Sequence, residues 1–210
     1  MWTIVVAAGS GRRFGADKLS VAVDGDRTVL DLSVETALQA GDGVVVVLRP
    51  DDPLLHATPV AGLTFVAGGD SRSASARNGL AAVPDTADVI LIHDAARPLA
   101  SVEVYDRVID AVLDGAAAVV PVVPVVDTIR AIDGRVVDRD ELRAVQTPQG
   151  FAASPLREAH AGEGEATDDA ALVAELGHDV VLVEGDLRSL KVTRPVDIAF
   201  ITALLEDPEA

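Results

Sequence analysis

The chain has 210 residues, of which 49% are hydrophobic but only 3% aromatic, so one domain with a core of Val, Ala, Leu and Ile is expected. Its formal net charge of −17 disfavours binding to nucleic acid or to anionic membranes, and the lack of cysteine excludes disulfides and thiolate metal sites. No apolar run approaches the roughly 20 residues of a membrane-spanning helix, and no segment has the layout of a signal peptide, so we expect a cytoplasmic protein.

Strand-like and helix-like patterns alternate along the chain. Apolar runs typical of buried strands cover Thr3–Ala7, Gly43–Leu48, Leu63–Ala67, Val89–Ile92, Ala116–Val120 and Asp179–Val183. Apolar residues at helical spacing cover Thr28–Ala40, Ser71–Ala82, Val102–Leu113, Thr167–Leu176 and Val196–Leu205. This order predicts an α/β fold with a Rossmann-like, doubly wound and mostly parallel sheet.

The segment from Val122 to Gln146 departs from this alternation. Its Asp133-Gly134 pair stands between two β-rich runs, which is a sequence signal of a hairpin. A two-stranded arm is only marginally stable alone in water. We therefore expect a single domain over residues 1–210 with a projecting β-arm at about 124–146, which rests on a second subunit.

The first predicted strand runs directly into a glycine-rich, cationic loop, VVAAGSGRRFGADK at 5–18. Open α/β sheets bind ligands at the carboxyl ends of their strands, where glycines let backbone N–H groups approach an anion. The spacing does not fit a dinucleotide turn, because Phe14 replaces the third glycine, and no Gly-Lys-Ser/Thr of a P-loop follows. A tight turn with a solvated basic patch and a loop that wraps a nucleoside triphosphate both fit. The crowding of Arg12, Arg13 and Lys18 in an acidic chain favours the triphosphate loop.

The motif LIHDAARP places Asp94 directly after a predicted buried strand. One carboxylate at such a position suits Mg²⁺, which keeps several waters and takes the rest of its ligands from substrate phosphates. Arg97 could grip a phosphate with two parallel hydrogen bonds. The alternative is that Asp94 caps a helix and pairs with Arg97. His93 is interpreted as structural.

The motif AGGDSRSASARNGL follows another predicted strand. The backbone of Gly69 and the hydroxyl of Ser75 carry the groups that could read the edge of a base. The alternative interpretation makes Ser71 a helix N-cap and Arg72 a solvated charge. Thr167 is likewise a plausible helix cap.

In their order, these motifs resemble the 2-C-methyl-D-erythritol 4-phosphate cytidylyltransferase family of the non-mevalonate isoprenoid pathway. The matching elements are A-A-G-S-G-x-R at 7–13, G-G-D-x-R-x-x-S at 68–75, H-D-A-A-R-P at 93–98, D-T at 127–128, D-R at 138–139, T-P-Q at 147–149, T-D-D at 167–169 and K-V-T-R-P at 191–195. The match runs from the first predicted strand to the last predicted helix. The first motif is shared by many nucleotidyltransferases, whereas H-D-A-A-R-P followed by K-V-T-R-P is far more specific.

The resemblance implies a homodimer with interlocking arms that transfers CMP from CTP to 2-C-methyl-D-erythritol 4-phosphate, giving CDP-methylerythritol and pyrophosphate. It implies catalytic roles for Arg13, Lys18 and Lys191, the first two on the triphosphate, and a role for Asp94 in binding Mg²⁺ or another divalent cation. Around CTP it places Ala7, Ala8, Gly9, Gly11, Gly69 and Ser75. Around the polyol phosphate it places Arg97, Thr128, Thr167 and Lys191, joined by Arg139 from the partner's arm.

Two features depart from the family pattern. Family members usually have Pro-Lys and a longer gap after the arginine, whereas here the lysine follows Asp17, five residues after Arg13. Arg130 stands in the arm where a lysine is commoner. Two alternatives stay open, a cytidylyltransferase for another polyol phosphate such as ribitol 5-phosphate, and a nucleotide-binding regulatory domain without catalysis.

The implied reaction needs no nucleophile from the protein. The phosphate of the substrate itself would add in line to the α-phosphorus of CTP, which agrees with the absence of cysteine and of a Ser-His-Asp pattern. Catalysis would then rest on positioning and on positive charge around an anionic transition state.

Overall fold

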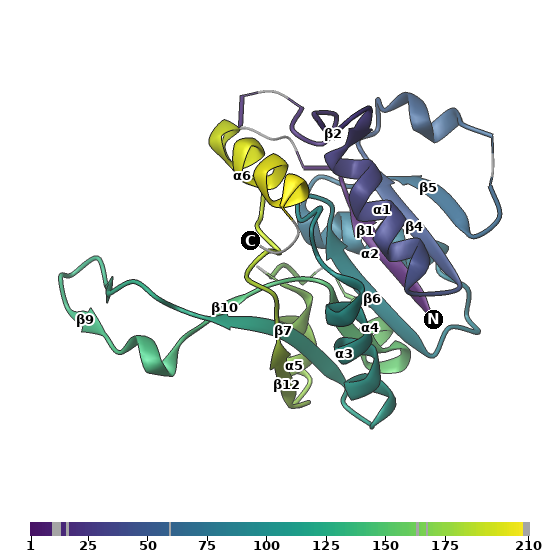
Figure 1. The fold of residues 1–210 in the computed structure, drawn as a ribbon. Coiled ribbons are helices and arrows are strands. Elements are labelled where there is room, and N and C mark those ends of the chain that lie inside the picture. The colour runs from purple at the N-terminus through teal and green to yellow at the C-terminus, as the bar shows by residue number, and fades with distance from the viewer. Residues whose placement is uncertain (10–13, 16, 59, 163, 167, 208–210) are drawn as a thin grey trace.

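The sheet at the centre of the molecule is mostly parallel, as predicted (Figure 1). A computed structural model describes residues 1–9, 14–15, 17–58, 60–162, 164–166 and 168–207. Within these ranges eight strands form one sheet, and seven of them follow one path. The path runs through β10 (Arg143–Val145), β7 (Ala118–Pro124), β11 (Gln149–Ala152), β6 (Val89–Asp94), β1 (Trp2–Val6), β4 (Gly43–Leu48) and β5 (Leu63–Ala67), while β12 (Val180–Glu184) pairs with β7.

Strand β1 lies between β4 and β6 and runs parallel to both. Strand β5 extends the parallel part beyond β4, and β11 is inserted antiparallel between β6 and β7. The carboxyl ends of β1, β4, β5 and β6 therefore meet at one edge of the sheet. This is the edge where α/β proteins bind their ligands.

Helices cover both faces of the sheet. On one face α1 (Val29–Gln39), α3 (Val102–Leu113) and α6 (Pro195–Glu206) contribute to one core, and on the other α2 (Arg72–Ala82), α4 (Ala153–Ala159) and α5 (Asp169–Glu175) contribute to a second core. Both faces of β4 are buried, since Val44 and Val46 enter the first core and Val45 and Val47 enter the second. This explains why the sequence of β4 is an unbroken run of Val. No helix within the described ranges is long and apolar enough to cross a bilayer.

Side-chain caps fix the starts of three helices. The Thr28 hydroxyl accepts from the Asp31 N–H at 3.2 Å, and the Ser71 hydroxyl accepts from the Ala74 N–H at 3.0 Å, so Ser71 is the expected N-cap. The helix predicted from Thr167 instead begins at Asp169, because Asp168 is the N-cap and accepts from the Ala171 N–H at 2.9 Å. Thr167 itself lies outside the described residues.

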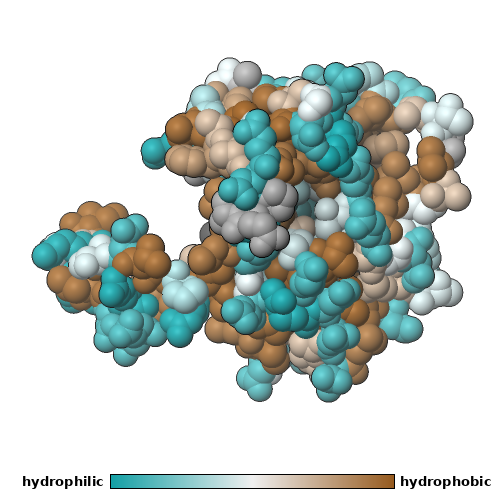
Figure 2. Space-filling model, in the orientation of Figure 1, coloured by the Kyte–Doolittle hydropathy of each residue, from teal (hydrophilic) through white to brown (hydrophobic). Residues whose placement is uncertain are grey.

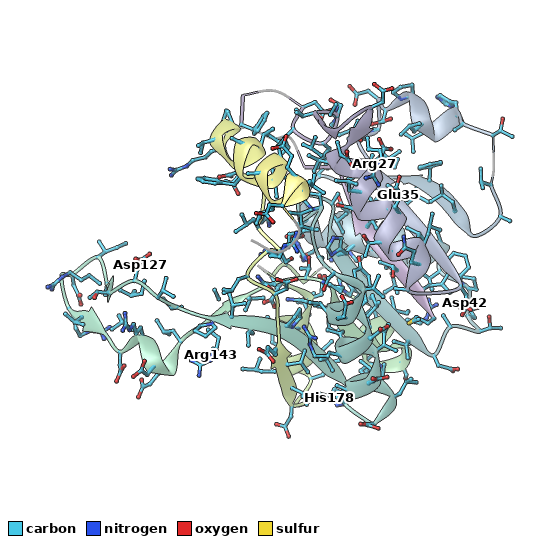
Figure 3. The ribbon with its side chains drawn as sticks, viewed as in Figure 1. Arg27, Glu35, Asp42, Asp127, Arg143 and His178 are labelled. Carbon is cyan, nitrogen blue, oxygen red and sulfur yellow. The ribbon has the colours of Figure 1, made fainter. Side chains whose placement is uncertain are left out.

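Several short elements complete the fold. A small hairpin of β2 (Ala22–Asp24) and β3 (Arg27–Thr28) precedes α1, and an ion pair of 2.9 Å joins Arg27 of the hairpin to Glu35 of α1 (Figure 3). Two short 3₁₀ helices cover Pro53–His56 and Arg139–Glu141.

The arm projects from the sheet between the end of β7 and β10, as predicted (Figure 1). Strands β8 (Ile129–Arg130) and β9 (Val136–Val137) pair antiparallel, and Gly134 takes a φ of 88° in the turn that joins them. Asp127 lies on this arm, away from the body of the molecule, and Arg143 lies at its base, where β10 joins the central sheet (Figure 3). Apolar side chains on the arm are strongly exposed, including Val126 at 74% and Val136 at 53% (Figure 2).

His93, in β6, is fully buried and links two loops next to the edge of the sheet. Its Nε2 lies 3.3 Å from the carbonyl oxygen of Arg97, and its Nδ1 lies 3.1 Å from the hydroxyl of Thr147. Since a carbonyl only accepts, Nε2 carries the proton and Nδ1 accepts from Thr147. Burial lowers the pKa of His93 from 6.5 to about 4, so the ring is neutral in the folded protein at neutral pH.

We expect this buried ring to make the protein less stable in acid. The unfolded chain takes up a proton near pH 6.5, whereas the folded protein does so only near pH 4, so the free energy of unfolding falls as the pH drops through this window. Between pH 7 and pH 5 the loss from His93 is about 2 kcal/mol. Urea unfolding at both pH values should show this component in the wild type and not in His93→Gln, and equal pH dependence in the two proteins would contradict it.

Candidate functional site

A cavity of about 510 Å³ opens at the carboxyl edge of the parallel strands. Its walls come from the segments that follow β1, β5 and β6 and from the segment before α6. The first three segments meet because β1, β5 and β6 end at the same edge of the parallel sheet. The segment before α6 joins them where the Val192 N–H donates to the Ala96 carbonyl at 2.8 Å. The cavity is lined by these residues of the predicted site: Ala7, Ala8, Gly9, Lys18, Gly69, Ser75, Asp94 and Lys191.

The segments after β1 and β5 are in close contact on one side of the cavity. A Cβ atom added to Gly68 would lie 2.4 Å from the Cβ of Ala8, so only glycine permits this approach. The N–H of Gly69 donates to the Ser75 hydroxyl at 3.1 Å, and that hydroxyl donates to the Ser71 carbonyl at 2.8 Å. Ser75 therefore fixes the shape of the loop after β5, and its expected contact with a base stays a prediction.

We expect Gly68→Ala to weaken CTP binding and to cost about 1–3 kcal/mol of stability, because the added methyl group must push the two loops apart. Isothermal titration with CTP and urea unfolding measure the two effects. Gly162→Ala is a matched control, since the same methyl group would meet nothing within 4 Å there. Unchanged CTP affinity in a folded Gly68→Ala protein would show that the close loop contact does not shape the site.

Asp94 lines the cavity at the end of β6. It ends β6, so the alternative in which it caps a helix is wrong. Its Oδ2 lies 2.5 Å from Lys191 Nζ, and its Oδ1 lies 3.8 Å from Arg72 Nε. Burial alone would raise the pKa of Asp94, but the positive charges of Lys191, Arg72 and Arg97 lower it to about 2. The carboxylate is therefore ionised at neutral pH, as a metal ligand must be.

The donor set around Asp94 fits Mg²⁺ bound together with substrate. No group of three or more His, Cys, Asp or Glu side chains within the described ranges could hold a metal ion by itself. Mg²⁺ does not need such a cage, because it is commonly bound by one or two carboxylates, waters and substrate phosphates. The Asp94 side chain is 15% exposed and lines the cavity, which leaves it accessible to a bound nucleotide.

Lys18 enters the cavity in spite of the short gap after Arg13. Its Nζ donates to the carbonyl oxygen of Val192 at 2.6 Å, which ties the first loop to the segment that carries Lys191. The neighbouring Asp17 is held by Arg49 at the end of β4, with 2.6 Å between Nη2 and Oδ2. The two lysines of the site thus border one cavity from opposite ends of the chain.

Three other predicted residues within the described ranges, Arg97, Thr128 and Arg139, do not line this cavity. The guanidinium of Arg97 donates to the carbonyls of Ser189 at 2.7 Å and Val145 at 3.1 Å, so it connects loops beside the site. Thr128 and Arg139 lie on the arm. Gly11, Arg13 and Thr167 lie outside the described residues. The substrate contacts expected of all these residues stay predictions.

Arg72 was not among the predicted site residues, yet its side chain also lines the cavity. It is not a solvated charge, since it is 27% exposed and its Nη1 lies 2.7 Å from an oxygen of the fully buried Asp169. The sequence signal that could have identified Arg72 as a site residue was its position in the G-G-D-x-R-x-x-S motif. The ion pair with Asp169 was not visible in the sequence, because it depends on how the fold brings together the first residues of α2 and α5.

Comparisons with known proteins agree with this geometry. The family model for 2-C-methyl-D-erythritol 4-phosphate cytidylyltransferase matches residues 1–207. A protein of that name from Rhodococcus jostii is 44% identical over 214 residues, covering 97% of this chain and 94% of the relative. One from Streptomyces avermitilis is 40% identical over 225 residues, covering 96% of this chain and 90% of the relative. The crystal structure of the Thermus thermophilus protein superimposes with a TM-score of 0.83 at 37% identity, covering 97% of this chain and 98% of that chain.

Proposed function

The chain belongs to the 2-C-methyl-D-erythritol 4-phosphate cytidylyltransferase family, and from this we propose that it transfers CMP from CTP to 2-C-methyl-D-erythritol 4-phosphate. One observation carries the proposal beyond membership of the family. Lys18, Lys191 and Arg72 converge with Asp94 on one cavity in a protein whose net charge is −17. Such a concentration of positive charge suits two phosphorylated substrates.

The reaction proceeds by attack of a phosphate oxygen of methylerythritol phosphate on the α-phosphorus of CTP. The bond from the α-phosphorus to the bridging oxygen of the β-phosphate breaks, and pyrophosphate leaves. Lys191, next to Asp94, supplies a compact positive charge to the reacting phosphate. Lys18, with Arg13, binds the triphosphate. The close loops around Ala8 and Gly69 hold the cytosine.

A divalent cation, Mg²⁺ in the first instance, is part of the proposal. Asp94 would hold it, because its carboxylate is ionised and lines the cavity. When bound, the cation neutralises phosphate charge. The tight Lys191 contact and the looser Arg72 contact give Asp94 two cationic neighbours that can turn to phosphate oxygens when substrates arrive.

We also propose that the arm at 124–146 joins two copies of the chain into a homodimer. The exposed apolar side chains Val126, Ile132 and Val136 on the arm support this, because a partner would bury them. Arg139 and Thr128 would then contact the polyol phosphate, with Arg139 coming from the partner's arm. We propose a cytoplasmic location, because the substrate CTP is supplied there.

A pyrophosphate-release assay with CTP and Mg²⁺ tests the function. It is run in parallel with methylerythritol 4-phosphate and with ribitol 5-phosphate. Release with the first substrate alone is expected. Pyrophosphate release with ribitol 5-phosphate alone would show that this compound is the substrate. If neither compound gives pyrophosphate but the protein binds CTP, the result would favour a nucleotide-binding regulatory domain.

A further inference from the structure

A chain of charged and polar side chains leads from the cavity into the interior between α2 and α5. Lys191 contacts Asp94 at 2.5 Å, and Arg72 stands on the other side of Asp94. Arg72 contacts Asp169, and Asp169 Oδ1 lies 3.2 Å from His160 Nε2. The proposed reaction accounts for the members that line the cavity, but not for Asp169 and His160 behind them.

Asp169 and His160 are buried behind the cavity wall. Asp169 is the first residue of α5 and is 0% exposed, and the His160 side chain directly after α4 is 2% exposed. A buried carboxylate is costly unless a cation pairs with it, and here Arg72 supplies that charge. Asp169 and Asp94 raise the pKa of Arg72 although burial opposes this, so the guanidinium stays charged.

The two carboxylates do not share Arg72 equally. Its Nη1 is 2.7 Å from Asp169, whereas its Nε is 3.8 Å from Asp94, beyond hydrogen-bond distance. Without the charge of Asp169, the nearest anion for Arg72 would be Asp94. A guanidinium binds a carboxylate through two parallel hydrogen bonds, and such a pair would occupy the oxygens that a divalent cation needs.

We propose that Asp169, supported by His160, is a positioning residue that holds Arg72 at the cavity wall and keeps it from closing onto Asp94. Asp94 is thereby left free for a divalent cation, and Arg72 is left to face substrate phosphate. This inference rests on the proposed function for the identity of the cation and the phosphates. The competition between Arg72 and a cation for Asp94 can be tested by measuring cation binding, without measuring enzymatic activity.

The test measures binding of Mn²⁺ in the presence of CTP by electron paramagnetic resonance on the full chain. Asp169→Asn should weaken Mn²⁺ binding by about 10- to 100-fold, as expected for loss of a group that orients a metal ligand. The double variant Arg72→Ala/Asp169→Asn should bind Mn²⁺ nearly as tightly as the wild type, because no guanidinium is left to compete. Both variants should turn over slowly, because Arg72 no longer faces phosphate.

Glu165→Gln is the matched control. Glu165 also pairs with an arginine of α2, Arg77, at 3.4 Å, but neither side chain lines the cavity. Its Mn²⁺ affinity should equal that of the wild type. Thermal melting verifies that each variant is folded. If Asp169→Asn does not fold, His160→Gln is used, and a weaker effect in the same direction is expected.

Three results would overturn the proposal. They are unchanged Mn²⁺ affinity in folded Asp169→Asn, failure of the double variant to restore that affinity, and absence of Mn²⁺ binding in the wild type. A wild type that binds Mn²⁺ and CTP but releases no pyrophosphate would contradict the proposed function alone. In that case, restoration of Mn²⁺ binding in the double variant Arg72→Ala/Asp169→Asn would still test the role of Asp169.

Discussion

Lys191→Ala is expected to lower kcat for pyrophosphate release by about 100- to 1,000-fold while the protein stays folded. The Nζ atom lies 2.5 Å from Asp94 and lines the cavity, where the reacting phosphates would carry their highest negative charge. The side chain is 42% exposed, so its loss leaves no large void in the core. Asp94 also keeps Arg72 beside it, which limits the cost to folding.

Steady-state assays at saturating CTP and polyol phosphate, with thermal melting of the same samples, measure this effect. Lys191→Arg should recover only part of the rate, because a planar guanidinium does not replace a compact ammonium at one reacting atom. Arg194→Ala is the control, since Arg194 is an exposed cation in the same segment that does not line the cavity. Near-normal turnover of Lys191→Ala would remove Lys191 from the catalytic residues.

The parallel half of the sheet was predictable because its central strands β1, β4 and β6 are buried on both faces. The bounds expected for β4 and β5 and for α3 match the structure residue for residue. A strand made of consecutive Val residues has apolar side chains on both faces, and both faces are buried when helices cover the two sides of the sheet. The segments that follow β1 and β6 then had to meet at one edge, where Lys18, Asp94 and Lys191 line one cavity. The catalytic and metal-binding roles expected of these three residues stay predictions.

The antiparallel insertion was not predictable from local pattern. Strand β11 has four residues and α4 has seven, which is too short for either periodicity to stand out. Strand β11 exists because the edges of β6 and β7 accept its backbone hydrogen bonds, and that is a property of the assembled sheet. The contact of Arg72 with Asp169 is of the same kind, since nothing in either local sequence indicates the other residue.

Mixing two inactive variants should restore activity if each site is completed by the partner's arm. Arg139 lies on the arm, which projects away from the body of its own chain, so we expect Arg139→Ala to lose most activity with the cavity intact (Figure 1). Lys191→Ala inactivates the other component of the same site. In a hybrid dimer, one site would combine native Lys191 from one chain with native Arg139 from the other.

Random association of equal amounts makes half of the dimers hybrid, and each hybrid has one intact site of two, so about one quarter of wild-type activity is expected. The two proteins are unfolded together in urea and refolded, and native mass spectrometry of tagged chains counts the hybrids. A mixture of wild type with Lys191→Ala is the control and should give about half of wild-type activity, because each wild-type chain keeps its own intact site.

The two arrangements of Arg139 give opposite results. If Arg139 served the cavity of its own chain, every site in a hybrid dimer would lack either Arg139 or Lys191, and the mixture would stay inactive. Inactive mixtures that contain hybrid dimers would therefore reject the contribution of the partner's arm. Recovery near one quarter would show that the arm completes the site of the partner chain, and the exposed Val126 and Ile132 of the same arm would then be candidates for burial in that contact.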